Sequence, residues 1–341
     1  MKLLITGGAG FIGSNFIHYI LAKYPDYKIV NLDALTYAGN LDNLREVEKK
    51  YGSGALSAER RYWFVKGDIR DRELVSEIIR RVDGIINFAA ESHVDRSILN
   101  PQEFLSTNVL GTHTLLEAAR KHGIKRFLHI STDEVYGSIE RGYFQESDPL
   151  TPNSPYSSSK AAADLLVMAY FKTYGLPVLI TRTTNNFGPY QHPEKFIPLF
   201  ITNFLDNKKV PLYGYGLNRR DWIYVEDNCE AIDLVFHHGC EGEIYNIGTN
   251  SNELTNIEIA SRLAYILGRS PHLIEFTKDR PGHDYRYGID ISKIKELGWR
   301  HRHDFESGLL KTVEWYKQNE WWWRKIKNDE FEKYYQENYK L

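Results

Sequence analysis

The sequence predicts an α/β protein: a Rossmann-type, doubly wound parallel sheet with a smaller C-terminal α/β lobe that binds the substrate. In the first half, short apolar runs alternate with helical patterns, which indicates βαβ units with parallel strands. A glycine-rich turn follows the first apolar run, and turn signals become dense after Arg182. We therefore expect a first domain over residues 1–182 and a mainly substrate-binding lobe over 183–341, with some segments of the lobe returning to the first domain.

The elements follow from this alternation in chain order. Expected strands are Lys2–Thr6, Lys28–Leu32, Tyr62–Lys66, Gly84–Phe88, Arg126–Ile130 and Val178–Thr181. Expected helices are Phe11–Lys23, Pro101–His122, Ser157–Thr173, Val225–His237, Asn256–Leu267 and Phe305–Asn319. The apolar residues of Pro101–His122 and Ser157–Thr173, among them Val109 and Leu165, are expected mostly in the core, with a subunit interface as the alternative.

Bulk composition narrows the class of protein. The 341 residues are 42% hydrophobic and 26% charged, as in a globular protein. A net charge of −2 with dispersed cations predicts no nucleic-acid partner, so an anion must be held by local cations. Two cysteines without CxxC or zinc spacing predict no metal site and a reducing compartment. Without an 18-residue apolar run or a secretory leader, we expect a cytoplasmic enzyme with no membrane partner.

Gly7, Gly10 and Gly13 separate the first expected strand from the first expected helix. Glycine at these positions permits a tight turn and lets the backbone approach a pyrophosphate, which the helix N-terminus binds. Glycine spacing alone is weak evidence, but the strand, turn and helix context is the one that a dinucleotide site requires. We predict a dinucleotide-binding loop rather than an ordinary glycine-rich turn.

Asp33 ends the second expected strand, 20 residues after Gly13. An acid there accepts hydrogen bonds from the adenosine ribose and repels a 2′-phosphate, which favours NAD over NADP. Capping of the following loop is the alternative for Asp33. Asp68 and Ile69 follow the third strand, where Asp68 either reaches the adenine or caps the next helix.

Ser131-Thr132-Asp133-Glu134 follows the fifth apolar run. The carboxyl ends of parallel strands face the ligand crevice, so these residues place a hydroxyl and two carboxylates there. Two carboxylates can divide the roles of acid and base if their surroundings separate their pKa values. Taken alone, an acidic pair more often caps or solvates a loop. The glycine-based and tyrosine-based motifs of the chain are what favour an active site here.

Tyr156 and Lys160 stand four residues apart, on one face of an expected helix. We expect the lysine cation, and a positively charged nicotinamide ring, to lower the pKa of the phenol, so that a tyrosinate takes a proton from a sugar hydroxyl. Such a pair arises often by chance. With the glycine loop and Thr132, it predicts a dehydrogenase-type site.

Together these motifs resemble the extended short-chain dehydrogenase/reductase superfamily, and longer blocks resemble the dTDP-glucose 4,6-dehydratase family. The blocks are Asn31–Asn40, Ala89–Ser97, Thr132–Glu134, Thr183–Lys195, Arg220–Trp222 and Asp279–His283. The resemblance extends from Met1 to at least Tyr316. Departures are small: three serines lie between Tyr156 and Lys160 where the family often has alanine, and residues 51–60 look like a loop variation.

The resemblance implies a lyase that oxidises C4 of dTDP-glucose with NAD, eliminates water across C5 and C6, and returns the hydride to C6. It implies that Tyr156 takes the C4 hydroxyl proton, that Lys160 holds the nicotinamide ribose, and that Thr132 bonds the C4 oxygen. Glu134 is then the base at C5 and Asp133 the acid at C6, although the sequence leaves open which pKa is raised. A homodimer, resident NAD and a place in deoxysugar (rhamnose) biosynthesis are also implied.

The resemblance further implies two sets of binding residues and no metal. Those assigned to NAD are Gly7, Gly10, Phe11, Ile12, Gly13, Asp33, Ala34, Leu35, Thr36, Asp68, Ile69, Phe88, Ala89, Ala90, Glu91, Ser92, Thr107, Tyr156, Lys160 and Asn186. Those assigned to the nucleotide sugar are Ser92, Thr132, Asn185, Lys195, Pro211, Tyr213, Arg220, Asn256, Arg280 and His283. Guanidinium forks suit a diphosphate, with surface salt bridges as the alternative for both arginines. Tyr339, in the least family-typical segment, is the weakest match.

Three other functions share parts of this pattern. A nucleotide-sugar 4-epimerase needs the glycine loop, Asp33, Thr132, Tyr156 and Lys160, but not the acidic pair. Dehydratases acting on GDP-mannose or CDP-glucose differ in the nucleotide. A non-catalytic NAD-binding scaffold does not need the hydride-transfer residues.

Overall fold

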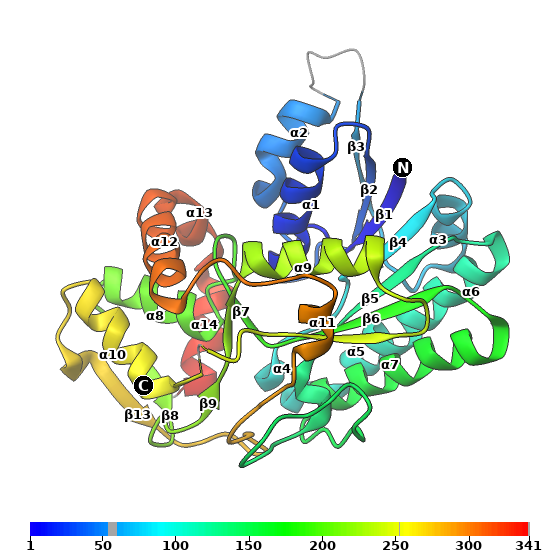
Figure 1. Cartoon of the computed structure of the whole chain (residues 1–341). Coiled ribbons are helices and arrows are strands. Elements are labelled where there is room, and N and C mark those ends of the chain that lie inside the picture. Colours follow the sequence, from blue (N-terminus) through cyan, green and yellow to red (C-terminus); the bar gives the residue numbers. More distant parts are fainter. Residues whose placement is uncertain (54–59, 252, 340–341) are drawn as a thin grey trace.

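The computed structural model describes residues 1–53, 60–251 and 253–339, so the loop expected at 51–60 lies mostly outside the described residues. Its centre is a seven-stranded, all-parallel sheet of order β11-β6-β5-β4-β1-β2-β3 (Figure 1). The strands are β1 (Lys2–Thr6), β2 (Lys28–Asp33), β3 (Tyr62–Lys66), β4 (Gly84–Asn87), β5 (Phe127–Thr132), β6 (Val178–Thr183) and β11 (Ile244–Ile247). The predicted fold class is confirmed.

Helices cover both faces of the sheet because its strands are apolar on both sides. One face carries α1 (Phe11–Lys23), α2 (Arg45–Tyr51) and α9 (Val225–His238), and the other carries α3 (Arg72–Ile79), α6 (Thr112–His122) and α7 (Pro155–Tyr174). The order of the strands reverses at β1, between β4 and β2. In such a sheet the crevice beyond the strand ends at this point is the usual ligand site.

The second lobe has its own core of aromatic side chains, which includes Phe187, Phe200 and Trp222. Its elements are β7 (Asn185–Phe187), α8 (Phe196–Leu205), β8 (Val210–Tyr213), β9 (Arg219–Arg220), β10 (Trp222–Tyr224), β12 (Leu254–Thr255), α10 (Asn256–Ile266), β13 (Ile274–Thr277), α12 (Phe305–Gln318), α13 (Glu320–Ile326) and α14 (Asp329–Tyr339). Three elements from the second half, α9, β11 and α11 (Ser292–Glu296), pack with the first domain. The exact domain boundary at residue 182 stays a prediction.

The prediction of one regular helix over Pro101–His122 is wrong in the middle of that range. The range consists of α5 (Pro101–Phe104), a π-helical segment Leu105–Gly111 and α6, and it follows the short helix α4 (Val94–Leu99). The wider turn points Asn108 inward, where its side chain bonds both backbone groups of Glu91 at 2.9 and 3.0 Å. Regular helical spacing does not reveal such a turn, although π-helical turns occur often at functional sites.

The outer side of these helices is less buried than the apolar spacing predicts. Leu165 of α7 is 63% exposed, and Leu105 and Leu110 of the π-helical segment are 53% and 60% exposed. Among the described helices, none is long and apolar enough to cross a bilayer.

Candidate active site

A cavity lies at the carboxyl edge of the sheet, beyond the ends of β1, β2, β4, β5 and β6. It is lined by all five predicted catalytic residues and by every predicted cofactor contact except Leu35. A second cavity lies beside it, against the second lobe, and shares with it Ser92, Glu134, Asn185 and Lys195. The fold thus brings both predicted residue sets into one continuous site.

The glycine turn needs glycine at two of its positions. Gly7 has φ +67°, and a Cβ on it would lie 2.6 Å from the backbone nitrogen of Ala89. A Cβ on Gly13 would lie 2.4 Å from the Gly7 carbonyl oxygen. No side chain caps the start of α1 at Gly10. The turn therefore presents bare backbone and a helix N-terminus to the cavity, the arrangement that suits a pyrophosphate.

Asp33 serves both the loop and the cavity. Its carboxylate accepts hydrogen bonds from Leu35 N at 2.8 Å and from Ala9 N at 2.9 Å, so it ties the glycine turn to the loop after β2. Burial raises the pKa of Asp33. The hydrogen bond holds Leu35 at φ +54°, and Leu35 does not line this cavity although its neighbours Ala34 and Thr36 do, so its contact with the cofactor stays a prediction.

Asp68 lines the cavity with Ile69 and does not cap α3. The N-cap of that helix is Asp71, whose carboxylate accepts from the amides of Glu73 and Leu74. Asp68 instead pairs with Arg70 at 2.6 Å. The helix-cap alternative for Asp68 is therefore wrong.

The acidic pair begins a 3₁₀ turn, Asp133–Tyr136, directly after β5. The cap of this turn is Thr132, whose Oγ1 accepts from Glu134 N at 3.3 Å and lies 3.2 Å from Asp133 Oδ1, to which it donates. Both carboxyl groups are thus free of the capping role and line the cavity. The alternative of a merely capped or solvated loop does not describe Asp133, which is only 3% exposed.

The surroundings of the two carboxyl groups differ in charge. Burial, followed by the negative charge of Glu134, raises the pKa of Asp133 to about 8. Burial also raises the pKa of Glu134, but the cations of Arg280, Arg220 and Lys195 oppose that rise. Near neutral pH the arrangement can therefore hold one proton on Asp133 beside a charged Glu134.

Tyr156 and Lys160 lie in the first turns of α7, which a capping box between Ser154 and Ser157 fixes in place. Burial, then the charges of Glu134 and Asp133, raises the pKa of Tyr156. The expected lowering of this pKa by Lys160 is therefore wrong in this structure, because desolvation and the carboxylates outweigh it. Burial also lowers the pKa of Lys160 to about 8. That a positively charged nicotinamide ring lowers the pKa of Tyr156 stays a prediction.

All predicted nucleotide-sugar contacts except Thr132 line the second cavity, and Tyr339 does so too. Arg220 is 5% exposed, stacks 4.3 Å from the Tyr287 ring and donates to the carbonyl of Asp284 at 2.8 Å. Arg280 forms an ion pair with Asp95 at 3.1 Å. The surface salt-bridge alternative fails for Arg220, and the pair of Arg280 is largely buried.

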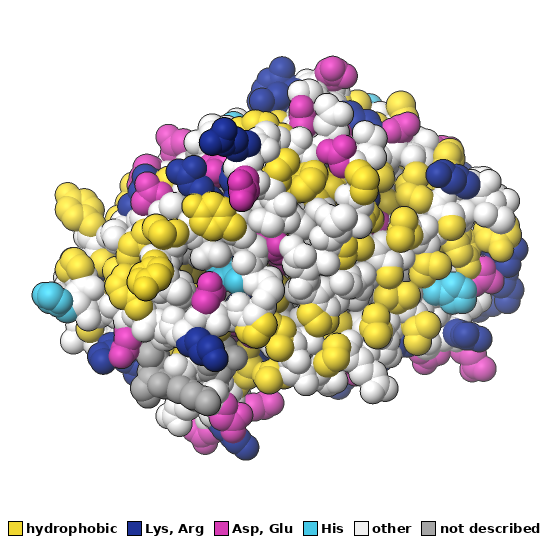
Figure 2. Space-filling view, turned by 90° about the horizontal axis from the view of Figure 1, so that it is seen from below, with side chains coloured by type: hydrophobic (Ala, Val, Ile, Leu, Met, Phe, Trp, Pro, Cys, Tyr) yellow, Lys and Arg dark blue, Asp and Glu magenta, His cyan; other side chains and the backbone are white. Residues whose placement is uncertain are grey.

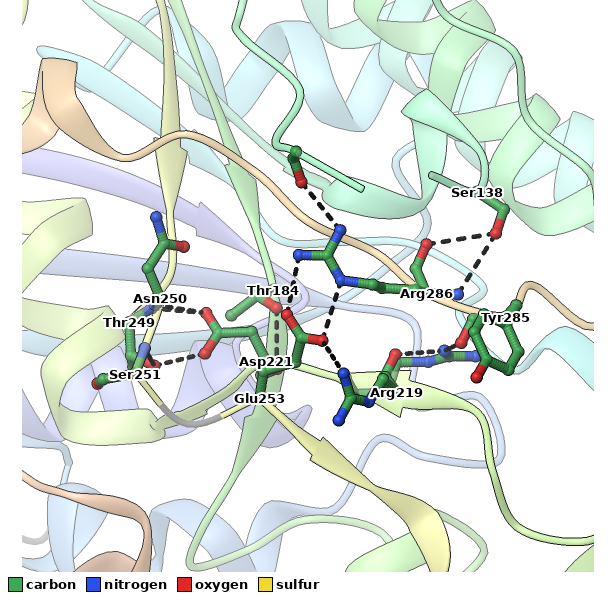
Figure 3. A network of polar contacts seen from close by, with 12 residues as sticks. Ser138, Thr184, Arg219, Asp221, Thr249, Asn250, Ser251, Glu253, Tyr285 and Arg286 are labelled. Atoms are coloured by element: carbon green, nitrogen blue, oxygen red, sulfur yellow. Dashed lines mark hydrogen bonds and ion pairs between the residues drawn. The ribbon is translucent and has the colours of Figure 1, made fainter. Parts of the chain in front are cut away.

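A polar network holds the backbone around Arg220 (Figure 3). The carboxylate of the next residue, Asp221, accepts from Thr249 N at 2.6 Å and Asn250 N at 3.2 Å, and the Asp221 carbonyl accepts from Thr184 Oγ1 at 2.9 Å. The network connects β6, β10 and the loop after β11. It fixes the backbone next to Arg220, and this adds to the contacts that the Arg220 side chain makes itself.

The structure adds site residues that sequence reasoning missed. Arg96 pairs with buried Glu194 at 2.9 Å, and its guanidinium lies 3.9 and 4.3 Å from the ring centres of Tyr37 and Tyr334. Tyr37 and Glu194 line the first cavity, whereas Tyr334 belongs to α14. Both charged residues stand in blocks already singled out, but nothing in the sequence pairs positions 98 residues apart. Within the described ranges, no cluster of His, Cys, Asp and Glu is suited to a metal.

Comparison with known proteins gives consistent matches over almost the whole chain. Residues 4–312 match the family model described as GDP-mannose 4,6 dehydratase. The chain is 55% identical to the low-salt glycan biosynthesis protein Agl12 of Haloferax volcanii, covering 93% of this chain and 98% of that protein.

Two solved structures bear on the alternatives. The dTDP-glucose 4,6-dehydratase DesIV of Streptomyces venezuelae, with NAD and TYD bound, is 51% identical with a TM-score of 0.90, covering 96% of this chain and 100% of that one. A UDP-glucose 4-epimerase of Thermus thermophilus, in complex with NAD, is 31% identical with a TM-score of 0.84, covering 94% and 100%. The chain is thus more similar to the dehydratase than to the epimerase.

Proposed function

This chain belongs to the GDP-mannose 4,6-dehydratase family, and from that membership we propose that it is an NAD-dependent dTDP-glucose 4,6-dehydratase. It converts dTDP-glucose to dTDP-4-keto-6-deoxyglucose with loss of water. The dehydratase of Streptomyces venezuelae, 51% identical over nearly the whole chain, supports the choice of substrate and cofactor. One observation carries the proposal: a buried acid and a charged base, Asp133 and Glu134, face the same cavity as Tyr156 and Lys160.

The first cavity fits NAD. The glycine turn leaves no room for a Cβ at Gly7 or Gly13, and Asp33 lies where it can meet the adenosine ribose. The remaining wall, residues 88–92, is held by Asn108, and Lys160 lies at the inner end. Bound there, NAD would supply the hydride acceptor for C4 of the sugar and, once reduced, the hydride donor for C6.

The first chemical task of the protein is to remove the proton of the C4 hydroxyl. Tyr156 is placed for this, with Thr132 beside it to hold the C4 oxygen. Lys160, four residues further along α7 and lining the same cavity, would supply a donor for the nicotinamide ribose. Because the ketone at C4 then acidifies the C5 hydrogen, a carboxylate can take over as base.

The second task is elimination across C5 and C6. Glu134, which three cations favour in its charged form, removes the C5 proton. Asp133, protonated below about pH 8, gives its proton to the C6 hydroxyl, which leaves as water. Glu134 then returns its proton to C5 as C6 is reduced. A 4-epimerase needs neither group, so their presence together at the cavity argues against that alternative.

The test is to incubate the protein with dTDP-, UDP-, CDP- and GDP-glucose and GDP-mannose, and to follow each sugar by mass spectrometry for loss of water and by proton NMR for epimerisation at C4. We expect a 4-keto-6-deoxy product, lighter by one water, from dTDP-glucose ahead of the others. Formation of the 4-epimer without loss of water would overturn the proposal in favour of a 4-epimerase. Preference for another nucleotide would overturn it in favour of a dehydratase acting on that nucleotide sugar. A protein that binds NAD but changes none of the sugars would be the scaffold.

We also propose a homodimer. Exposed leucines at 105, 110 and 165 lie on two packed segments, α7 and the π-helical segment. Figure 2 shows hydrophobic side chains spread over the face below the helices α5 to α7. Exposed leucines on two packed segments of one face support an interface with a second copy of the chain. The free cysteines Cys229 and Cys240 and the substrate support a cytoplasmic place in deoxysugar synthesis, including that of rhamnose.

A further inference from the structure

His129 lies directly behind Lys160 and has no part in the reaction as described above. It stands in β5, is fully buried, and places Nε2 3.3 Å from Lys160 Nζ. The same ammonium donates to the carbonyl of Ile130 at 2.7 Å. Lys160 is thus held by two acceptors from neighbouring residues of one strand.

The contact determines the tautomer of the imidazole. An ammonium group has only donors, so His129 Nε2 accepts and the ring carries its proton on Nδ1. Burial and the charge of Lys160 lower the pKa of His129 well below its usual value, which keeps the ring neutral. Nδ1 lies 3.1 Å from Asn87 Nδ2, so a proton on Nδ1 requires the Asn87 amide to be turned over, with its oxygen toward the ring.

A buried negative charge lies near the same ring nitrogen, Nε2. Asp164, one turn beyond Lys160 on α7, is fully buried and receives Arg182 Nε on Oδ2 at 2.9 Å. Its Oδ1 lies 3.7 Å from His129 Nε2 and has no hydrogen-bond partner among the described residues. The charged groups around His129 are thus Lys160 and Asp164 from α7 and Arg182 from β6, while β4 contributes the neutral Asn87.

We propose that His129 and Asp164 are positioning residues for Lys160: the imidazole aims the ammonium by accepting from it, and the carboxylate supplies the buried charge that keeps it a cation. Their effect opposes desolvation, which by itself favours the neutral amine. Consistently, Asp164 raises the pKa of Lys160 against the lowering by burial. The role of Lys160 in this proposal rests on the proposed function, but the test measures the titration of the Lys160 amine directly.

The test follows the titration of Lys160 in NAD-free protein by NMR of lysine labelled with ¹³C at Cε, the signal being assigned with Lys160→Met. Four variants are compared: His129→Leu, His129→Gln, Asp164→Asn and, as a control, Thr181→Val. Gln retains an acceptor near the position of Nε2, and Leu does not. Thr181 is buried on the adjacent strand, opposite Ile130, so its variant changes the core without touching Lys160.

We expect the titration midpoint of Lys160 to fall by about half a pH unit or more in His129→Leu and Asp164→Asn, and to stay near the parent value in His129→Gln and Thr181→Val. A midpoint unchanged in His129→Leu and Asp164→Asn would overturn the proposal, as would equal shifts in all four variants. If Asp164→Asn does not fold because Arg182 loses its partner, the two His129 variants decide.

A second readout separates this inference from the proposed function. With dTDP-6-deoxyglucose, which has no C6 hydroxyl to lose, the reaction stops after the first oxidation, and the nicotinamide absorbance reports its rate. We expect the alkaline decline of this rate to begin at lower pH in His129→Leu and to return to the parent position in His129→Gln. If the parent protein oxidises no nucleotide sugar while the NMR midpoints shift as expected, the proposed function fails and the positioning role stands.

Discussion

The side chains of Asp133 and Glu134 face one cavity, and the charge of Glu134 adds to burial in raising the pKa of Asp133 to about 8. Two adjacent carboxyl groups in a dry site titrate as a pair, so one proton is shared unequally between them. Arg280, Arg220 and Lys195 face Glu134 and assign the negative charge to it. The division between acid and base is therefore a property of the surroundings of the two groups, not of their chemistry.

Glu134→Gln separates the two halves of the reaction. We expect the first oxidation to continue and water loss to slow by about 100-fold or more, because an amide cannot remove the C5 proton. Mass spectrometry of the products and the nicotinamide absorbance measure the two steps. The matched control is Glu140→Gln, at an exposed site nearby. Dehydration at the parent rate in Glu134→Gln would rule out Glu134 as the base.

The rate of dehydration should fall as the pH rises through about 8. Asp133 acts as an acid only while protonated, and its raised pKa places the loss of that proton near this value. The rate of water loss under saturating dTDP-glucose, measured between about pH 6 and 10, tests this. Asp133→Asn should retain the first oxidation and lose elimination at every pH. An elimination rate that stays level above pH 9 would contradict the acid role of Asp133.

Asp133 also makes the stability depend on pH. Its pKa is near 3.9 when unfolded and about 8 when folded, so the folded state binds more protons between these values. Stability from this group is complete below about pH 4 and is lost as the pH rises to about 8. The melting temperature of Asp133→Asn relative to the parent should therefore increase from pH 5 to 8. A constant difference would show that Asp133 does not titrate in this window.

Tyr156→Phe should stop the first oxidation. Phenylalanine keeps the buried ring and its contact with Phe104 but removes the hydroxyl that takes the C4 proton. We expect at least about a 100-fold loss in rate with dTDP-6-deoxyglucose, the lower end of the range of acid–base contributions. Nucleotide-sugar affinity, measured by calorimetry, should change little. Normal hydride transfer in this variant would refute the role of Tyr156.

Glu194→Gln should destabilise the protein and loosen the site. Burial alone would raise the pKa of Glu194, but His93, His192, Arg96 and Lys195 outweigh it and lower the pKa to about 2. The charged form thus stabilises the fold above about pH 4, and that stability is lost as the pH falls toward 2. Removing one partner of a buried pair costs about 3 kcal/mol, which thermal unfolding at pH 7 measures. The exposed acid variant Glu314→Gln, on α12, is the control.

Leu165→Asp and Leu110→Glu should convert the proposed dimer to a monomer. Both side chains are exposed on α7 and the π-helical segment, so a charge there costs little in the free subunit but cannot be buried in an interface. Sedimentation velocity measures the change. Leu310→Glu, at a 53% exposed position on α12, should leave the assembly as it is. A monomeric parent protein would contradict the proposal outright.

Much of the fold was predictable because its signals are local. The alternation that predicts β1 to β6 and the spacing of Gly7, Gly10 and Gly13 both follow from the needs of one segment of backbone. The end of β5 could be located from the apolar run before Ser131, which placed Thr132 and the acidic pair at the sheet edge. These features require no knowledge of which distant residues meet.

Other features could not be predicted from local patterns. The π-helical turn depends on Asn108 reaching the backbone of Glu91, and the exposure of Leu165 depends on which side of α7 meets the sheet. The expected lowering of the Tyr156 pKa by Lys160 considered two residues of one helix and left out the burial and carboxylates that dominate it. Arg96 and Glu194 both lie in sequence blocks that resemble the family, but the sequence does not predict that they form an ion pair.

The sequence by itself determined the parallel α/β architecture, the glycine turn, and the identity of the groups that can exchange protons. Only the tertiary structure decided how those groups differ: which carboxyl retains its proton, what stands behind Lys160, and which helix side faces outward. The physical reason is that strand and helix formation depends on neighbours in sequence, whereas desolvation and electrostatic interaction depend on neighbours in space.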